Sequence, residues 1–120
     1  MTSLVTAHDV EVRESEIHGR GVFAKTDIHE GIVVEESPLT RTTIHSENDR
    51  HTFLNNYFWS DEEDNYILSL GLASVFNRSN IPNLIFEAFL DEGFYRFTAC
   101  RDLWEGEELF IDYTKRILRS

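Results

Sequence analysis

Alternation of apolar and polar residues is the first pattern along the chain. Val10 and Val12 alternate with charged neighbours, which is typical of a strand with one buried face. The glycine-containing residues 18–21 predict a turn, and apolar residues resume at 22–24. After a further glycine break, the β-branched residues 32–34 favour another strand. The first third of the chain is therefore predicted to be β.

Helical spacing replaces this alternation in the middle of the chain. Four apolar residues recur at intervals that predict a short helix: Phe53, Leu54, Tyr57 and Phe58. Ser60 and Glu63 have the spacing of a capping box, and the apolar residues between 67 and 72 then predict a second short helix.

Strand patterns return after Pro82. Two apolar and aromatic runs, residues 84–90 and 94–99, are joined by Asp-Glu-Gly and predict a hairpin. A last strand is predicted at residues 109–113, after a turn at Glu105 and Gly106. Several short strands with a small helical insert, and no alternation of strands and helices, predict a β-rich α+β fold.

The composition supports one folded domain spanning residues 1–120. The chain has 120 residues, of which 41% are hydrophobic, enough to bury a core without disulfides or zinc. Cys100 is the single cysteine, so it forms no intramolecular disulfide, and a reducing compartment is expected. No apolar run reaches the roughly 20 residues of a membrane helix. We expect a soluble intracellular protein that acts in the cytoplasm or the nucleus, without membrane contact.

Net charge narrows the class of partner. The chain carries a formal charge of −11 and has a sequence pI near 4.7. The negative electrostatic field of this charge opposes direct nucleic-acid binding and favours a basic protein or peptide as partner. An acidic run at residues 61–64 is a candidate peptide groove, although a solvated face near a helix start explains it more simply.

Three segments carry candidate chemistry, and each has an ordinary interpretation. Residues 18–24, His-Gly-Arg-Gly-Val-Phe-Ala, have the composition of a turn entering a strand. Residues 77–83, Asn-Arg-Ser-Asn-Ile-Pro-Asn, are typical of a loop. Residues 106–113, Gly-Glu-Glu-Leu-Phe-Ile-Asp-Tyr, fit a terminal strand.

Together and in this order, the three segments resemble the motifs of SET domains, a fold of protein lysine methyltransferases. The resemblance covers residues 10–113, and residues 114–120 form a short tail. In length, the chain is similar to the minimal virus-type or bacterial members of the family. The resemblance implies a fold of several small sheets with a knot-like threading of the chain after the central motif. That threading would bring Asn77 near Tyr113.

The resemblance also implies the chemistry of the site. The cofactor would be S-adenosylmethionine, leaving S-adenosylhomocysteine as product, and the substrate would be a lysine of a basic protein such as a histone. Family position assigns the catalytic role to Tyr113. The candidate cofactor-binding residues are Gly19, Arg20, Gly21, Tyr57, Asn77 and Arg78, the last through its backbone. Core packing is an alternative role for Tyr57.

Transfer of a methyl group to lysine explains these residue types. The lysine amine must be neutral and aligned with the methyl donor, although its unperturbed pKa is about 10.4. A sulfonium charge and an apolar channel both disfavour the ammonium form. Glycine backbone amides can hold a carboxylate, as in other anion-binding nests.

Two departures from the family motif leave alternatives open. Arg78 and Asn80 replace the family's histidine and cysteine in the central motif. A catalytically weak or inactive module that binds a basic peptide is therefore the second hypothesis. Because residues 114–120 hold no cysteine-rich zinc segment, a homodimer, an ordered substrate or the basic tail must close the lysine channel.

A metal site is the third and weakest hypothesis. His45, Asp49 and His51 lie close together in the sequence, but their spacing matches no strong ligand pattern. No metal ion is therefore predicted.

Overall fold

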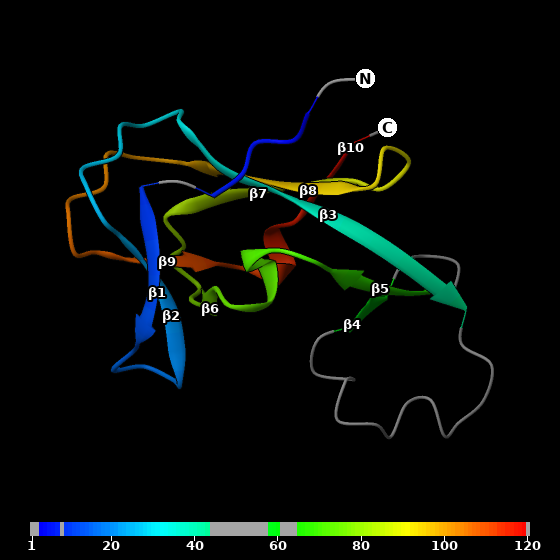
Figure 1. The fold of residues 1–120 in the computed structure, drawn as a ribbon, viewed down its shortest axis with the longest axis horizontal. Coiled ribbons are helices and arrows are strands. Elements are labelled where there is room, and N and C mark those ends of the chain that lie inside the picture. The colour runs from blue at the N-terminus through cyan, green and yellow to red at the C-terminus, as the bar shows by residue number, and fades with distance from the viewer. Residues whose placement is uncertain (1–2, 8, 44–57, 61–64, 120) are drawn as a thin grey trace.

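The computed structural model describes residues 3–7, 9–43, 58–60 and 65–119. Strands dominate this part of the chain, and the only helices in it are two single 3-10 turns. The elements are β1 (Val10–Glu14), β2 (Arg20–Ala24), β3 (Val33–Thr43), β4 (Phe58–Ser60), β5 (Asn65–Ser69), η3 (Leu72–Ser74), β6 (Asn77–Arg78), β7 (Leu84–Phe89), β8 (Phe94–Ala99), β9 (Glu108–Ile111), η4 (Tyr113–Lys115) and β10 (Ile117–Arg119) (Figure 1).

A four-stranded sheet with the order β1-β2-β9-β6 contains the predicted N-terminal hairpin. β1 and β2 are antiparallel from the pair Val10–Ala24 at the open end to the pair Glu14–Arg20 at the turn. Gly19 in this turn has a φ of 49°, a conformation that glycine adopts at little cost. This sheet contains parts of all three motif segments, the central one through β6.

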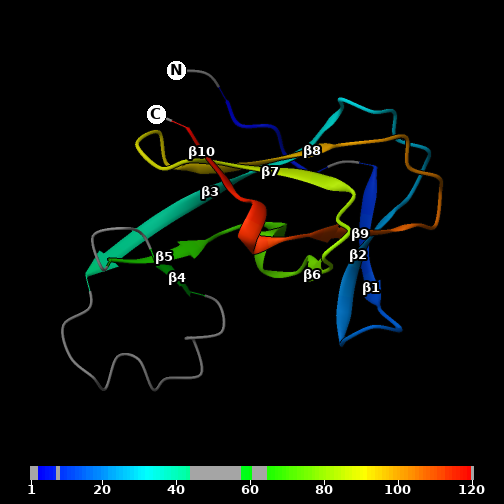
Figure 2. The same cartoon turned by 180° about the vertical axis from the view of Figure 1, so that it is seen from behind.

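A six-stranded sheet with the order β10-β7-β8-β3-β5-β4 forms the other half of the molecule. Its β7–β8 hairpin confirms the prediction for residues 84–99, and Gly93 in the turn has a φ of 83°. The long β3 pairs with β8 near its start and with β5 near its end. Figures 1 and 2 show β3 crossing the molecule beside this hairpin.

One aromatic core joins the two sheets. Phe97 of β8 has its ring centroid 4.8 Å from those of both Phe86 in β7 and Phe76. Val22 and Leu109, paired across β2 and β9, are also fully buried in this core. Because Phe76 directly precedes β6, its burial positions the central motif segment against both sheets.

Parallel pairing of β6 with β9 brings the central and closing segments together. Asn77 is opposite Phe110, and Arg78 is opposite Ile111. Buried Asn83 strengthens this junction: its Nδ2 donates to the Glu108 carbonyl at 2.8 Å, and its Oδ1 accepts from the Phe110 amide at 2.7 Å. The knot-like threading itself remains a prediction.

The predicted helical insert is wrong where the structure describes it. Residues 65–69 form β5, which pairs with β3 and β4, and only the 3-10 turn η3 follows it. Short apolar runs have similar sequence patterns in helices and central strands, which explains the error. The first predicted helix lies outside the described residues, except that Phe58 begins β4. Glu63 of the capping box predicted for the second helix also lies outside them. No helix within the described ranges is long and apolar enough to cross a membrane.

The C-terminal strand was also predicted too long. β9 ends at Ile111, and Tyr113 begins the 3-10 turn η4 instead of continuing the strand. After this turn, β10 adds a parallel strand beside β7, which the sequence analysis did not predict. The turn moves Tyr113 out of the sheet and toward the cavity described next.

Candidate functional site

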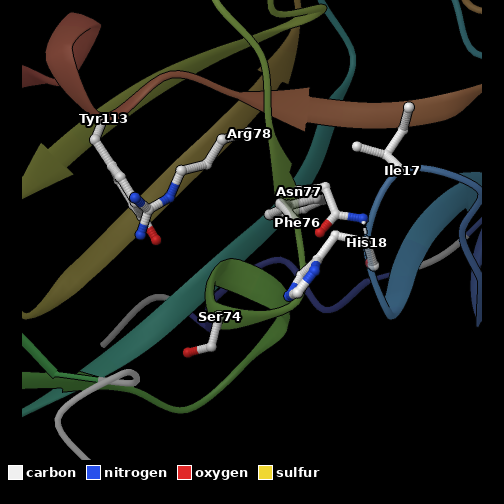
Figure 3. Close-up of a pocket in the computed structure, with 7 residues that line it drawn as sticks. All are labelled: Ile17, His18, Ser74, Phe76, Asn77, Arg78 and Tyr113. Atoms are coloured by element: carbon white, nitrogen blue, oxygen red, sulfur yellow. Dashed lines mark hydrogen bonds between the residues drawn. The ribbon is translucent and has the colours of Figure 1, made fainter.

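A cavity of about 600 Å³ lies where the N-terminal hairpin, the central segment and the closing segment meet. Its lining residues come from all three segments: Ile17, His18, Ser74, Phe76, Asn77, Arg78 and Tyr113. Figure 3 shows their side chains around one space. The fold thus brings Tyr113 to the same cavity as the adjacent residues Asn77 and Arg78, from which it is far apart in the sequence.

The amide nitrogen of Asn77 is held by three oxygen atoms on one side. Asn77 Nδ2 lies 2.7 Å from Glu108 Oε2, 3.1 Å from the His18 carbonyl and 3.2 Å from the Arg20 carbonyl. These contacts tie β6 to the turn between β1 and β2. Arg20 therefore joins the site through its backbone carbonyl, and its side chain is exposed.

The carboxylate of Glu108 is fixed from both ends. Ser15 Oγ donates to Glu108 Oε1 at 2.7 Å, while Asn77 donates to Oε2. Gly21 makes room for this carboxylate, because a Cβ at position 21 would lie 2.9 Å from Glu108 Cδ and 3.0 Å from Asn77 Nδ2. The two motif glycines thus meet different needs: Gly19 has a positive φ, whereas Gly21 permits a close approach of side chains.

The neighbouring Glu107 has a different role. It pairs with Arg101, with 3.0 Å between Arg101 Nη2 and Glu107 Oε1, and accepts from the Trp104 amide at 2.6 Å. The hydrogen bond from Arg101 holds the pKa of Glu107 below its ordinary value. Glu107 thus stabilises the turn before β9, whereas Glu108 reaches the site.

Arg78 packs on the ring of Tyr113. Its guanidinium carbon lies 3.6 Å from the ring centroid, a cation–π arrangement (Figure 3). This side chain takes the place of the histidine expected from the family motif. It places a positively charged guanidinium beside the tyrosine ring.

The turn that carries Tyr113 is capped by Asp112. Its Oδ1 accepts from the Thr114 hydroxyl at 2.6 Å and from the Thr114 amide at 2.9 Å. These hydrogen bonds hold the pKa of Asp112 below its ordinary value, so the cap is ionised at neutral pH. The cap sets the direction in which the chain carries Tyr113 away from β9.

Several predicted features lie outside the described residues. They are Tyr57, the acidic run at 61–64, and the metal candidates His45, Asp49 and His51. In the described part of the chain, no three His, Cys, Asp or Glu residues are grouped so that they could hold a metal ion.

Sequence reasoning missed Glu108 and Ser15 as residues of the site. Glu108 stood within the closing motif but was assigned no role, and Ser15 carried no motif signal. The contact between Ser15 and Glu108 joins residues 93 positions apart, and the contact between Glu108 and Asn77 joins residues 31 positions apart. Only the folded sheet therefore reveals these contacts.

Comparison with known proteins agrees with this geometry. The SET domain family matches residues 19–114. The chain is 31% identical to the Schizosaccharomyces pombe histone-lysine N-methyltransferase specific for H3 lysine-37, over 87% of this chain and 72% of that protein. It is 30% identical to a variant-silencing SET domain-containing protein of Plasmodium falciparum, over 92% of this chain but 5% of that protein.

Solved structures share the fold. A Plasmodium falciparum protein named as a candidate histone methyltransferase aligns with a TM-score of 0.70 and 21% identity, covering 91% of this chain and 95% of that one. A chain of the Chaetomium thermophilum Polycomb Repressive Complex 2 aligns with a TM-score of 0.71 and 26% identity, covering 90% and 15% of the two chains. The chain therefore belongs to the SET domain family, the lysine methyltransferase family that its three motif segments resemble.

Proposed function

We propose that this protein is a lysine N-methyltransferase that uses S-adenosylmethionine and acts on a basic protein, with a histone tail as the substrate class. The observation that carries the proposal is the meeting of Asn77 and Tyr113 at one cavity in a SET domain. We also propose that the protein acts in the nucleus or the cytoplasm.

The residues at the cavity fit this cofactor. Its volume of about 600 Å³ lies in the range that binds small ligands. Within the described part of the chain, no hydrogen-bond donor reaches Asn77 Oδ1, which leaves an acceptor for an amino group. The residues proposed to hold the cofactor are Gly19, Arg20, Gly21, Asn77 and the backbone of Arg78. When bound, S-adenosylmethionine supplies an electrophilic methyl group.

Tyr113 is proposed to orient the lysine amine. Tyr113 begins a 3-10 turn that Asp112 caps, so the position of its hydroxyl is restricted. A hydroxyl in a restricted position suits the alignment of a nucleophile. The amine must be neutral to attack. The guanidinium of Arg78 beside Tyr113 disfavours a second positive charge there, which lowers the pKa of a lysine at this position.

A basic substrate follows from the charge of the chain. A net charge of −11 attracts a cationic peptide and speeds its encounter with the protein. The fission yeast relative is named for lysine 37 of histone H3, which supports the same class. The homodimer predicted from the family resemblance remains a further proposal.

One observation favours a second function. Arg78, which replaces the histidine of the family motif, covers one face of the Tyr113 ring. If this replacement impairs catalysis, the protein is a module that binds a basic peptide with little turnover. Product formation separates the two functions.

The deciding experiment is mass spectrometry of intact histones after incubation with purified protein and S-adenosylmethionine. Wild-type protein is expected to add methyl-sized masses to lysine, and Tyr113→Phe is expected to lower the rate by about 100-fold, since it removes the orienting hydroxyl. Tyr95→Phe is the matched control: it removes a tyrosine hydroxyl from the buried core on β8 and should keep turnover.

Each outcome distinguishes the candidates. Wild-type rates in Tyr113→Phe would contradict the role of this hydroxyl. Absence of product from a folded wild-type protein that binds S-adenosylhomocysteine and a histone tail would support the binding module.

A further inference from the structure

The two ends of the Asn77 amide have different surroundings. In the described part of the chain, Nδ2 makes all three hydrogen bonds of this amide, and their acceptors are a carboxylate and two backbone carbonyls. Figure 3 shows the nitrogen on the side of the His18 backbone and the oxygen on the side of Arg78 and Tyr113. The oxygen is therefore the end available to a ligand in the cavity.

Rotating this amide by 180° would place Oδ1 against three other oxygen atoms. None of these atoms can donate a hydrogen bond while Glu108 is ionised, so three hydrogen bonds would be replaced by repulsive contacts. The strongest of the three is the one to Glu108, which is the shortest at 2.7 Å and is assisted by charge.

Glu108 is itself held in place. Ser15 Oγ donates to its other oxygen and in turn accepts from the Ile17 amide at 3.0 Å. The absent side chain at Gly21 leaves the space that the carboxylate fills. Because both of its oxygens are bound and its flank is closed, Glu108 presents a fixed acceptor to Asn77.

We propose that Glu108 is a positioning residue that holds the Asn77 amide with Oδ1 toward the cavity, where it accepts a hydrogen bond from the amino group of the cofactor. This inference rests on the proposed use of S-adenosylmethionine. It assigns a role to the second glutamate of the closing segment and predicts that cofactor recognition depends on a residue that does not touch the cofactor.

The test compares two ligands by calorimetry. One is S-adenosylhomocysteine, and the other is its desamino analogue, in which hydrogen replaces the amino group. The wild-type protein is expected to prefer the first by at least about tenfold, the effect of one hydrogen bond to a charged group. Glu108→Leu removes the acceptor and should bring this preference close to one, with little change in affinity for the analogue.

Two further variants separate orientation from other effects. Glu108→Gln keeps an oxygen that can accept from Asn77 but loses the charge, so it should retain the preference. In an Asn77→Ala background, Glu108→Leu should no longer change the preference for S-adenosylhomocysteine over its desamino analogue. If Glu108→Leu does not fold, as judged by circular dichroism, Ser15→Ala replaces it and should reduce the preference several-fold.

The outcomes also separate this inference from the proposed function. A wild-type protein that binds S-adenosylhomocysteine but keeps its preference in Glu108→Leu overturns the inference alone. Loss of the preference in Glu108→Gln as well would assign the effect to charge and overturn it too. If folded wild-type protein binds neither ligand, both the proposed function and the inference are contradicted.

Discussion

The two glycines of the first motif segment, Gly19 and Gly21, serve different purposes. The family resemblance predicts that Gly21 lets the backbone of the chain come close to the cofactor. The structure adds a reason that no spacing shows: a Cβ would collide with the Glu108 carboxylate and the Asn77 amide. Gly19 is required for its φ of 49° instead, since a Cβ at position 19 would meet no described residue within 4 Å other than its two chain neighbours.

Gly21→Ala is therefore expected to act through side-chain crowding. The added methyl group should displace Glu108 and lower the free energy of unfolding by about 1–3 kcal/mol, with weaker binding of S-adenosylhomocysteine. Urea unfolding and calorimetry measure the two effects. Gly93→Ala is the control: its φ of 83° should cost stability, but it should leave binding unchanged. Wild-type binding and stability in Gly21→Ala would show that the carboxylate moves aside freely.

At the scale of elements, the junction of β6 with β9 positions the site. Parallel strands of two and four residues have few hydrogen bonds of their own, so side chains must reinforce the pairing. Buried Asn83 does so with both ends of its amide. The sequence marked this residue as part of a motif, but only the fold shows that its role is structural.

Removing this amide in Asn83→Ala should lower the free energy of unfolding by at least about 2 kcal/mol, because two backbone groups of β9 lose their partners. Urea denaturation provides the measurement. Asn80→Ala is the matched control on the same loop, since Asn80 is exposed and contacts Lys115 through its carbonyl. Equal stability of the two variants would contradict the role assigned to Asn83.

Element prediction failed where neighbouring strands decide the conformation. Residues 65–69 lie between β3 and β4, and their apolar run matches a helix as well as it matches a central strand. The β7–β8 hairpin was predicted correctly because its turn, Asp91-Glu92-Gly93, is a local signal. Local turn chemistry was thus more informative than hydrophobic spacing.

Charge acts at the scale of the whole molecule. A net charge of −11 gives a long-range field, which salt screens over about 10 Å at 0.1 M. For a histone-tail peptide we expect KM to rise several-fold between about 50 and 300 mM salt, because steering of the cation weakens. Affinity for S-adenosylhomocysteine, which has no net charge, is the control and should change little. A salt-independent KM would argue against a basic substrate.

The sequence by itself determined the family, the β-rich character and the three motif segments, because glycine turns, alternating strands and short motifs are local features of the chain. Only the tertiary structure decided how these segments meet. The stacking of Arg78 on Tyr113 and the network of Ser15, Glu108 and Asn77 depend on contacts between residues tens of positions apart. Such contacts leave no periodic trace in the sequence, since they arise when β9 pairs with β2 and β6 in one sheet.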